Sequence, residues 1–200
     1  MKAALFGGIT LAAAAGLGLY AYSTTRTPEP CGDTVVAGAA IGGPFELVSE
    51  TGETVTDRDV ITGPTLVYFG YTFCPDVCPL DVMRNAQAAD ILAEQGKTLD
   101  TVFITVDPAR DTVDVVRAFT DNFHPDMIGL TGSDEQVKAA SQAYKTYYRI
   151  ADDDPEFYLV DHSTQSYLMF PDTGFATFFR NDTPPERVAE VAACFIDQLS

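Results

Sequence analysis

The stretch that decides the fold runs from Thr65 to Pro79 and reads Thr-Leu-Val-Tyr-Phe-Gly-Tyr-Thr-Phe-Cys-Pro-Asp-Val-Cys-Pro. Residues 65–71 form an apolar, β-branched and aromatic run, which predicts a buried strand. Pro79 suits the first position of a helix, because its missing N–H would have no partner there and its φ is already helical. The stretch therefore predicts a strand, a loop that carries Cys74, and a helix that begins beside Cys78.

Strands and helices alternate on both sides of this stretch. Helices are predicted at about 79–94, 113–122, 134–144 and 185–199, and further strands at 45–48, 53–56, 101–106, 127–130, 157–160, 166–170 and 176–180. This alternation indicates parallel strands with helices on both faces, and the last strands, separated only by loops, indicate an antiparallel part. We predict an α/β thioredoxin-like fold over residues 44–200, with a central mixed sheet flanked by helices.

The amino-terminal residues predict a membrane anchor. Residues 3–22 carry no formal charge, and twenty helical residues span about 30 Å, the hydrocarbon thickness of a bilayer. We predict an uncleaved single transmembrane helix at 1–23 and a Pro- and Gly-rich linker at 24–43, with a cleaved signal peptide as the alternative. The domain then lies in the periplasm, held at the inner membrane.

Charge restricts the classes of partner. The 200 residues include 12 Lys and Arg against 29 Asp and Glu, a formal net charge of −17. This balance opposes binding to phosphate backbones, so we predict no nucleic-acid partner.

Four cysteines have to be considered as disulfides in an exported domain. Three pairings are conceivable, and the simplest joins Cys31 to Cys194 and Cys74 to Cys78. The first bond would close a very long loop and stabilise the fold, whereas the alternative is two unconnected thiols.

Cys74 and Cys78 are the first candidates for chemistry. They follow the carboxyl end of a buried strand at the start of a helix, where free N–H groups and the helix dipole favour thiolates. Their C-x-x-x-C spacing leaves a redox pair, a metal pair and structural cysteines open. His162 lies in a polar loop that could meet the cysteines, its alternative being a surface or capping histidine, while His124 suits a helix-exit turn. Two thiolates and one imidazole would suit Cu(I).

An ordered set of motifs resembles the Sco/SenC family of membrane-anchored copper chaperones that serve cytochrome c oxidase assembly. The set comprises Gly42-Gly-Pro-Phe, Val67 to Pro79, Thr105-Val-Asp-Pro-Ala-Arg-Asp-Thr112, His124-Pro, Gly129-Leu-Thr-Gly132, Val160-Asp-His-Ser163 and Tyr167-Leu-Met. By this resemblance Cys74, Cys78 and His162 are copper ligands. Asp107, and also Asp161 beside the histidine, are predicted to lie next to the ligands and tune the site.

We therefore expect a copper carrier rather than an enzyme, which binds Cu(I) and also Cu(II). It would receive copper from a donor protein and pass it to the copper-bearing subunit of cytochrome c oxidase, after a thioredoxin-like dithiol has reduced its cysteines. The alternatives are a thiol-disulfide oxidoreductase that reduces the copper-ligand cysteines of the oxidase, and a redox or copper signalling module, both with the same residues.

Overall fold

The computed structural model describes Cys31 and residues 40–151 and 157–199. The strands are β1 (Glu46–Ser49), β2 (Thr54–Thr56), β3 (Thr65–Gly70), β4 (Asp100–Thr105), β5 (Ile128–Thr131), β6 (Tyr148–Ile150), β7 (Val160–His162), β8 (Ser166–Phe170) and β9 (Gly174–Phe179). The helices are α2 (Asp57–Val60), α3 (Val77–Glu94), α4 (Val113–Asp121), α5 (Asp134–Ala143) and α6 (Pro185–Leu199). Seven strands form the main sheet in the order β2-β1-β5-β4-β3-β8-β9, and β6 pairs with β7 in a separate sheet.

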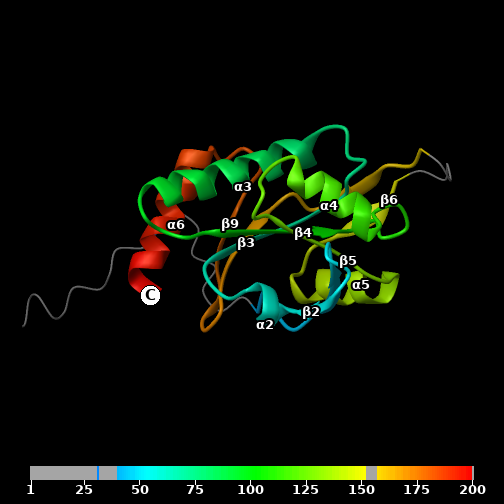
Figure 1. Ribbon diagram of the computed structural model, residues 1–200, viewed down its shortest axis with the longest axis horizontal. Helices are drawn as coiled ribbons and strands as arrows, with labels where there is room; N and C mark the ends of the chain where they lie inside the picture. Colours follow the sequence, from blue (N-terminus) through cyan, green and yellow to red (C-terminus); the bar gives the residue numbers. More distant parts are fainter. Residues whose placement is uncertain (1–30, 32–39, 152–156, 200) are drawn as a thin grey trace, which may run out of the picture. The chain divides into compact units, whose positions relative to one another are not determined.

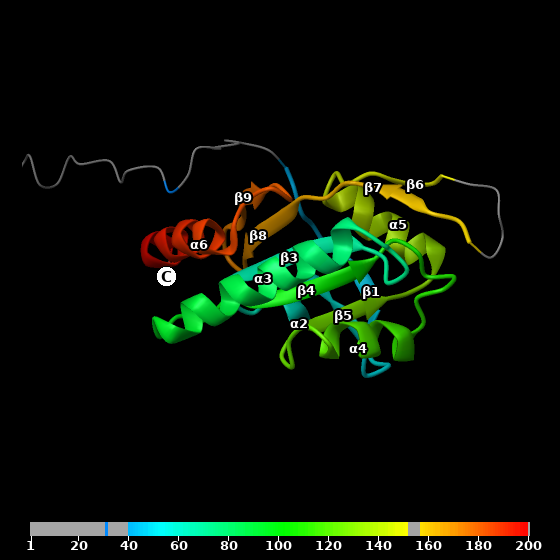
Figure 2. The same ribbon diagram turned by 90° about the horizontal axis from the view of Figure 1, so that it is seen from above.

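The strand predicted from Thr65 is the buried interior strand of the main sheet. All six residues of β3 are buried, and β3 pairs in parallel with β4, which pairs in parallel with β5. Both crossovers step across the sheet in the same direction, and such connections are right-handed, so α3 and α4 cover the same face. Figures 1 and 2 show α3, α4 and α6 on this face, with α2 and α5 on the opposite one.

Antiparallel strands complete both edges of the sheet. β1 pairs with β2 and β5, and β8 pairs with β3 and β9, all in antiparallel register. The predicted mixed α/β sheet with flanking helices and an antiparallel carboxyl-terminal part is confirmed.

Three details differ from the prediction. Helix α3 begins at Val77, so Pro79 is its third residue; proline is still accommodated, because N–H groups in the first turn have no intrahelical partner. Strand β7 begins at Val160 rather than at 157, and His162 ends this strand instead of following it in a loop. The short elements α2 and β6 were not predicted, because three or four residues are too few to establish a periodicity.

Cys31 and Cys194 form a disulfide, as the simplest pairing predicted. Their Cα atoms lie 5.4 Å apart, and 163 positions separate them in the sequence. Since Cys194 lies in α6, the bond ties a residue that precedes β1 to the last helix. Cys74 and Cys78 are free thiols.

Replacing both Cys31 and Cys194 by Ser is expected to lower the free energy of unfolding by about 2 to 4 kcal/mol, because the bond restricts a long loop in the unfolded chain. Urea denaturation followed by circular dichroism measures the difference. Wild-type protein in dithiothreitol should approach the stability of the variant, and equal stability of the oxidised wild type and the variant would contradict the prediction.

The predicted anchor at 1–23 and most of the predicted linker at 24–43 lie outside the described residues. Within the part that the structure describes, no helix combines the length and the apolar character needed to cross a bilayer. All described helices and strands fall within residues 44–200.

Candidate metal centre

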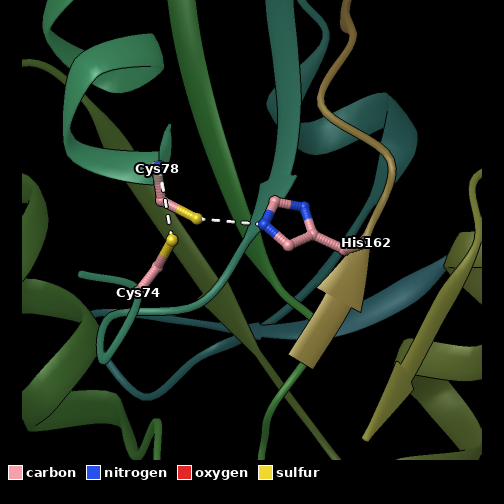
Figure 3. Close-up of side chains that lie close together, drawn as sticks. All are labelled: Cys74, Cys78 and His162. Carbon is pink, nitrogen blue, oxygen red and sulfur yellow. Dashed lines mark hydrogen bonds between the residues drawn. The ribbon is translucent and has the colours of Figure 1, made fainter. Parts of the chain in front are cut away.

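The side chains of Cys74, Cys78 and His162 meet at one point. One ligand atom from each residue lies within 4.8 Å of the other two. Cys78 Sγ is 3.2 Å from His162 Nε2, and the Cys78 backbone N–H donates to Cys74 Sγ at 3.4 Å (Figure 3). Among the described residues, no other group of three or more Cys, His, Asp or Glu side chains comes close enough to hold a metal ion. The predicted convergence is confirmed, and the role of the three residues as ligands stays a prediction.

Three elements present these side chains. Cys74 lies in the loop after β3, where its N–H donates to the carbonyl of Tyr71 at 3.3 Å, and Cys78 lies in the first turn of α3. His162 comes from the end of β7. β3 ends in Gly70 for a steric reason: a Cβ there would lie 3.0 Å from Cys78 Sγ and 2.8 Å from a ring carbon of Tyr68. The sulfur can therefore approach the strand only because this residue has no side chain.

The imidazole of His162 is oriented for binding through Nε2. Its Nδ1 lies 2.9 Å from the carbonyl oxygen of Ser163, which can only accept a hydrogen bond, so Nδ1 carries the proton of the neutral ring. The lone pair is then on Nε2, which faces the sulfurs. The rings of Tyr68 and Tyr71 lie edge-on to the imidazole, with centroids 6.2 and 5.7 Å away. These contacts fix the tautomer and the direction of the ring.

The two thiols have different acidities. A hydrogen bond from the Cys78 side chain lowers the pKa of Cys74 to about 3, with a further contribution from His162. The same pairing with Cys74, together with burial, raises the pKa of Cys78 above its ordinary value. The reduced site thus holds one thiolate and one thiol, and binding of a metal cation would release the second proton.

The donor set fits a soft metal ion. A metal with bonds of about 2.0 to 2.3 Å to nitrogen and sulfur would need its three ligands about 4 Å apart in a trigonal arrangement. The observed separations, none above 4.8 Å, approach this value, so small side-chain rotations suffice. Thiolate and imidazole ligands favour Cu(I) and Zn over Mg or Ca, which prefer oxygen.

A buried carboxylate, Asp111, holds the loop that carries Cys74. Its oxygens accept hydrogen bonds from the backbone N–H of Thr72 at 2.9 Å, from the Thr72 hydroxyl at 2.6 Å and from the Thr105 hydroxyl at 2.6 Å. Asp111 has no exposed surface. It therefore joins the cysteine loop to the end of β4.

A second buried network lies beneath Cys78. Tyr68 donates to Asp81 at 3.0 Å, and Arg84 pairs with the other oxygen of Asp81 at 2.7 Å. Arg84 also donates to the Ser166 hydroxyl at 2.7 Å and to the carbonyl of Arg180 at 2.8 Å. The network fixes the first turns of α3 against β3 and β8.

The two carboxylates predicted beside the ligands have other partners. Asp107 accepts from Arg110 Nε at 2.5 Å and from the Tyr158 hydroxyl at 2.6 Å. Asp161 forms an exposed ion pair with Arg149 at 2.9 Å. The contact to Nδ1 of His162 is made by the Ser163 carbonyl and not by Asp161. His124 lies apart, 3.3 Å from Asp90.

The roles of Asp111, Asp81, Arg84 and Arg110 are not predicted by any motif or periodicity in the sequence. Asp81 and Arg84 are opposite charges three residues apart on a predicted helix, and such a pair usually indicates a solvent-exposed face rather than a buried network. Asp111 and Arg110 belong to the segment that resembles the family, but charge in a loop gives no indication of burial.

Comparison with known proteins supports one family. The SCO1/SenC family model matches residues 34–197. Protein SenC of Rhodobacter capsulatus is 53% identical over 191 residues, which cover 96% of this chain and 86% of that protein. Among solved structures, Arabidopsis thaliana ScoI with copper bound is 39% identical with a TM-score of 0.75, covering 79% of this chain and 99% of that one. Yeast Sco1 with copper bound is 31% identical, with a TM-score of 0.75 and coverage of 81% and 91%.

The family match spans most of the chain, including the segments that carry both cysteines and the histidine. Together with the identity to Protein SenC over nearly the whole sequence, this match shows that the chain belongs to the SCO1/SenC family.

Proposed function

We propose that this protein is a copper chaperone that binds one copper ion through Cys74, Cys78 and His162. It delivers the ion to the dinuclear copper centre of cytochrome c oxidase during assembly. The observation that carries the proposal is the convergence of two sulfurs and a correctly oriented imidazole nitrogen within 4.8 Å.

Three further findings support copper as the cargo. The chain belongs to the SCO1/SenC family, and two related proteins of similar fold have been solved with copper bound. Two soft thiolates and one imidazole form a set of low coordination number that suits Cu(I). Binding of Cu(II) by the same site, with an additional ligand from solvent, remains part of the proposal.

The proposed location is the periplasmic side of the inner membrane, with residues 1–23 as a single-pass anchor. Support comes from the uncharged stretch at 3–22 and from the Cys31–Cys194 disulfide, which suits an oxidising compartment. A tether would raise the local concentration of the carrier near a membrane-embedded oxidase.

Metal loading requires the reduced site, because a Cys74–Cys78 disulfide has no thiolate to offer. In the proposed cycle a thioredoxin-like dithiol supplies two electrons and becomes a disulfide itself; of its two protons, one is taken up by Cys78 and one is released to solvent, which leaves Cys74 as a thiolate. A donor protein then transfers copper by ligand exchange, and the bound cation displaces the remaining thiol proton. The copper-bearing oxidase subunit takes the ion in the same way.

His162→Ala tests the proposal. Titration of the reduced protein with Cu(I) against a competing chelator should give one ion per wild-type chain and no tight binding in the variant, because two sulfurs alone leave the third position open. Unchanged copper affinity in His162→Ala would remove the histidine from the ligand set. Wild-type protein that binds no Cu(I) would refute the proposed function.

A thiol-disulfide oxidoreductase is the second candidate, and the thiolate character of Cys74 favours it. Cys74 would attack a disulfide of the oxidase subunit, and Cys78 would resolve the mixed disulfide, so that the target gains two thiols and this pair becomes a disulfide. His162→Ala separates the two functions, because it should largely spare dithiol turnover. If His162→Ala lost both dithiol turnover and copper binding, the imidazole would be needed for both activities.

A further inference from the structure

The metal centre is assembled from two parts of the fold that share no strand pairing. Cys74 lies in the loop after β3 of the seven-stranded sheet and Cys78 in the first turn of α3, whereas His162 belongs to the separate β6–β7 sheet. Figure 3 shows the imidazole reaching the sulfurs from the end of its own strand. β8, which pairs with β3, begins four residues after His162 and restrains the histidine from that side, whereas the Tyr158 side of β7 is joined to the cysteine loop through side-chain contacts.

Arg110 contacts both parts. On the cysteine side its guanidinium lies over the ring of Phe73, 4.8 Å from the centroid, and 5.8 Å from that of Tyr71. Phe73 immediately precedes Cys74. On the histidine side the guanidinium lies 3.6 Å from the centroid of the Tyr158 ring, and it donates to the Tyr158 carbonyl at 2.9 Å. Stacking and hydrogen bonding thus connect the segment before Cys74 to the segment that leads into β7.

The carboxylate of Asp107 holds both Arg110 and Tyr158. One carboxylate oxygen accepts from Arg110 Nε at 2.5 Å, and the other accepts from the Tyr158 hydroxyl at 2.6 Å. Asp107 is 4% exposed and follows β4, so its position is set by the main sheet. A buried carboxylate with two short hydrogen bonds defines the positions of both partners closely. Asp107, Arg110 and Tyr158, hereafter the clasp, form one connected unit.

We propose that Arg110 is a positioning residue for the metal centre, which sets the approach of His162 to the two sulfurs by joining Phe73 to Tyr158. This inference rests on the proposed function and extends it to residues that touch no ligand. The clasp acts through the backbone: it holds Tyr158, and so the start of β7, against the cysteine loop. When the clasp is loosened the cysteine loop keeps its hydrogen bonds from Thr72 to Asp111, so the histidine is the ligand whose position changes most.

Arg110→Lys is the decisive variant. Lysine keeps the positive charge but lacks the planar face that stacks on Phe73 and Tyr158 and the fork that reaches two oxygens. Cu(I) affinity is expected to fall about tenfold, the size of effect typical for residues that orient a metal ligand. Stoichiometry should stay at one ion, and X-ray absorption at the copper edge should show a weaker nitrogen contribution with the sulfur contribution unchanged. A residue with only a structural role would not change the ligand set.

The metal-free protein gives a second readout. Amide hydrogen exchange over residues 158–163 should speed up in Arg110→Lys, whereas the amides of β3 and β4 should keep their protection. Tyr158→Phe retains the stacked ring and loses only the hydroxyl that donates to Asp107, so a smaller change of the same kind is expected. This variant also serves if Arg110→Lys does not fold.

Arg117→Lys is the matched control. Arg117 also pairs with an aspartate three residues away, Asp114, but this exposed pair lies on α4. It should change neither copper affinity nor the exchange of residues 158–163. Unchanged affinity, nitrogen contribution and exchange in both Arg110→Lys and Tyr158→Phe would overturn the inference. If the wild type binds no Cu(I), the proposed function fails, while the exchange comparison still decides whether Arg110 positions the histidine strand.

Discussion

Cys78→Ser should lower the affinity for Cu(I) by more than about 100-fold. Replacing a residue that only supports a metal ligand costs up to about 100-fold, and replacing a ligand itself should cost more. Cys78 Sγ is fully buried and lies 3.2 Å from His162 Nε2, so it occupies the centre of the donor set. A serine hydroxyl is similar in shape but is a hard, neutral oxygen that Cu(I) binds poorly. Competition with a Cu(I) chelator under reducing conditions measures the change.

Met83→Leu is the control for this substitution. Met83 offers another sulfur one to two turns along the same helix and is 47% exposed. Leucine conserves its volume and removes the thioether, so affinity should stay at the wild-type value. A Cys78→Ser variant that keeps wild-type affinity would show that Cys78 is not a ligand, and a Met83→Leu variant that loses affinity would show that the thioether contributes to binding.

Arg84→Met is expected to lower the free energy of unfolding by about 3 to 5 kcal/mol, because it leaves the buried carboxylate of Asp81 without its charged partner. The Arg84 side chain is 6% exposed and that of Asp81 is 2% exposed. Burial already raises the pKa of Asp81, and Arg84 opposes that shift. In the variant the pKa of Asp81 rises further, and a protonated carboxyl is tolerated in the interior. The loss measured by urea denaturation should therefore be largest near neutral pH and shrink as the pH falls through the pKa of Asp81.

Two further variants serve as comparisons for the stability of Arg84→Met. Arg117→Met removes the cation of an exposed ion pair and should change stability by no more than about 1 kcal/mol. Adding Asp81→Leu to Arg84→Met removes the unpaired charge and should recover part of the loss, which a double-mutant cycle quantifies. A loss in Arg84→Met that is small and independent of pH would contradict the assigned ion pair.

The core of the site could be predicted because chemistry and spacing point to it directly. Cys74 and Cys78 follow a run of buried-strand residues and precede a helix, so their place at the end of a central strand follows from pattern alone. His162 was harder: nothing in local periodicity relates it to residues 84 positions earlier, and only the resemblance to a family connected them. His162 lies at the end of β7 rather than in a loop, because a strand of three residues is too short to give a recognisable alternation in the sequence.

The supporting residues could not be predicted, because their roles depend on tertiary contacts. Asp81 and Arg84 fit the pattern of a surface pair on a helix, yet Arg84 contacts Ser166 of β8 and the carbonyl of Arg180, and both side chains are buried. Asp107 was expected to tune the ligands, whereas its oxygens are used by Arg110 and Tyr158. Tyr158 is 51 residues from Asp107, and no local rule pairs them.

The bond between Cys31 and Cys194 bears on how the proposed copper carrier would be kept in its reduced, metal-binding form. Opening this bond would lower the free energy of unfolding of the domain. That loss adds to the free energy that a reductant has to supply. A bond between Cys74 and Cys78 would close a loop across only four positions and restrict the unfolded chain far less. The lowered pKa of Cys74 stabilises the thiolate that forms when such a bond opens, which favours its reduction by a mild dithiol. The reduced metal-binding pair is thus stabilised by its own thiolate, whereas reduction of Cys31 and Cys194 would leave the folded domain less stable.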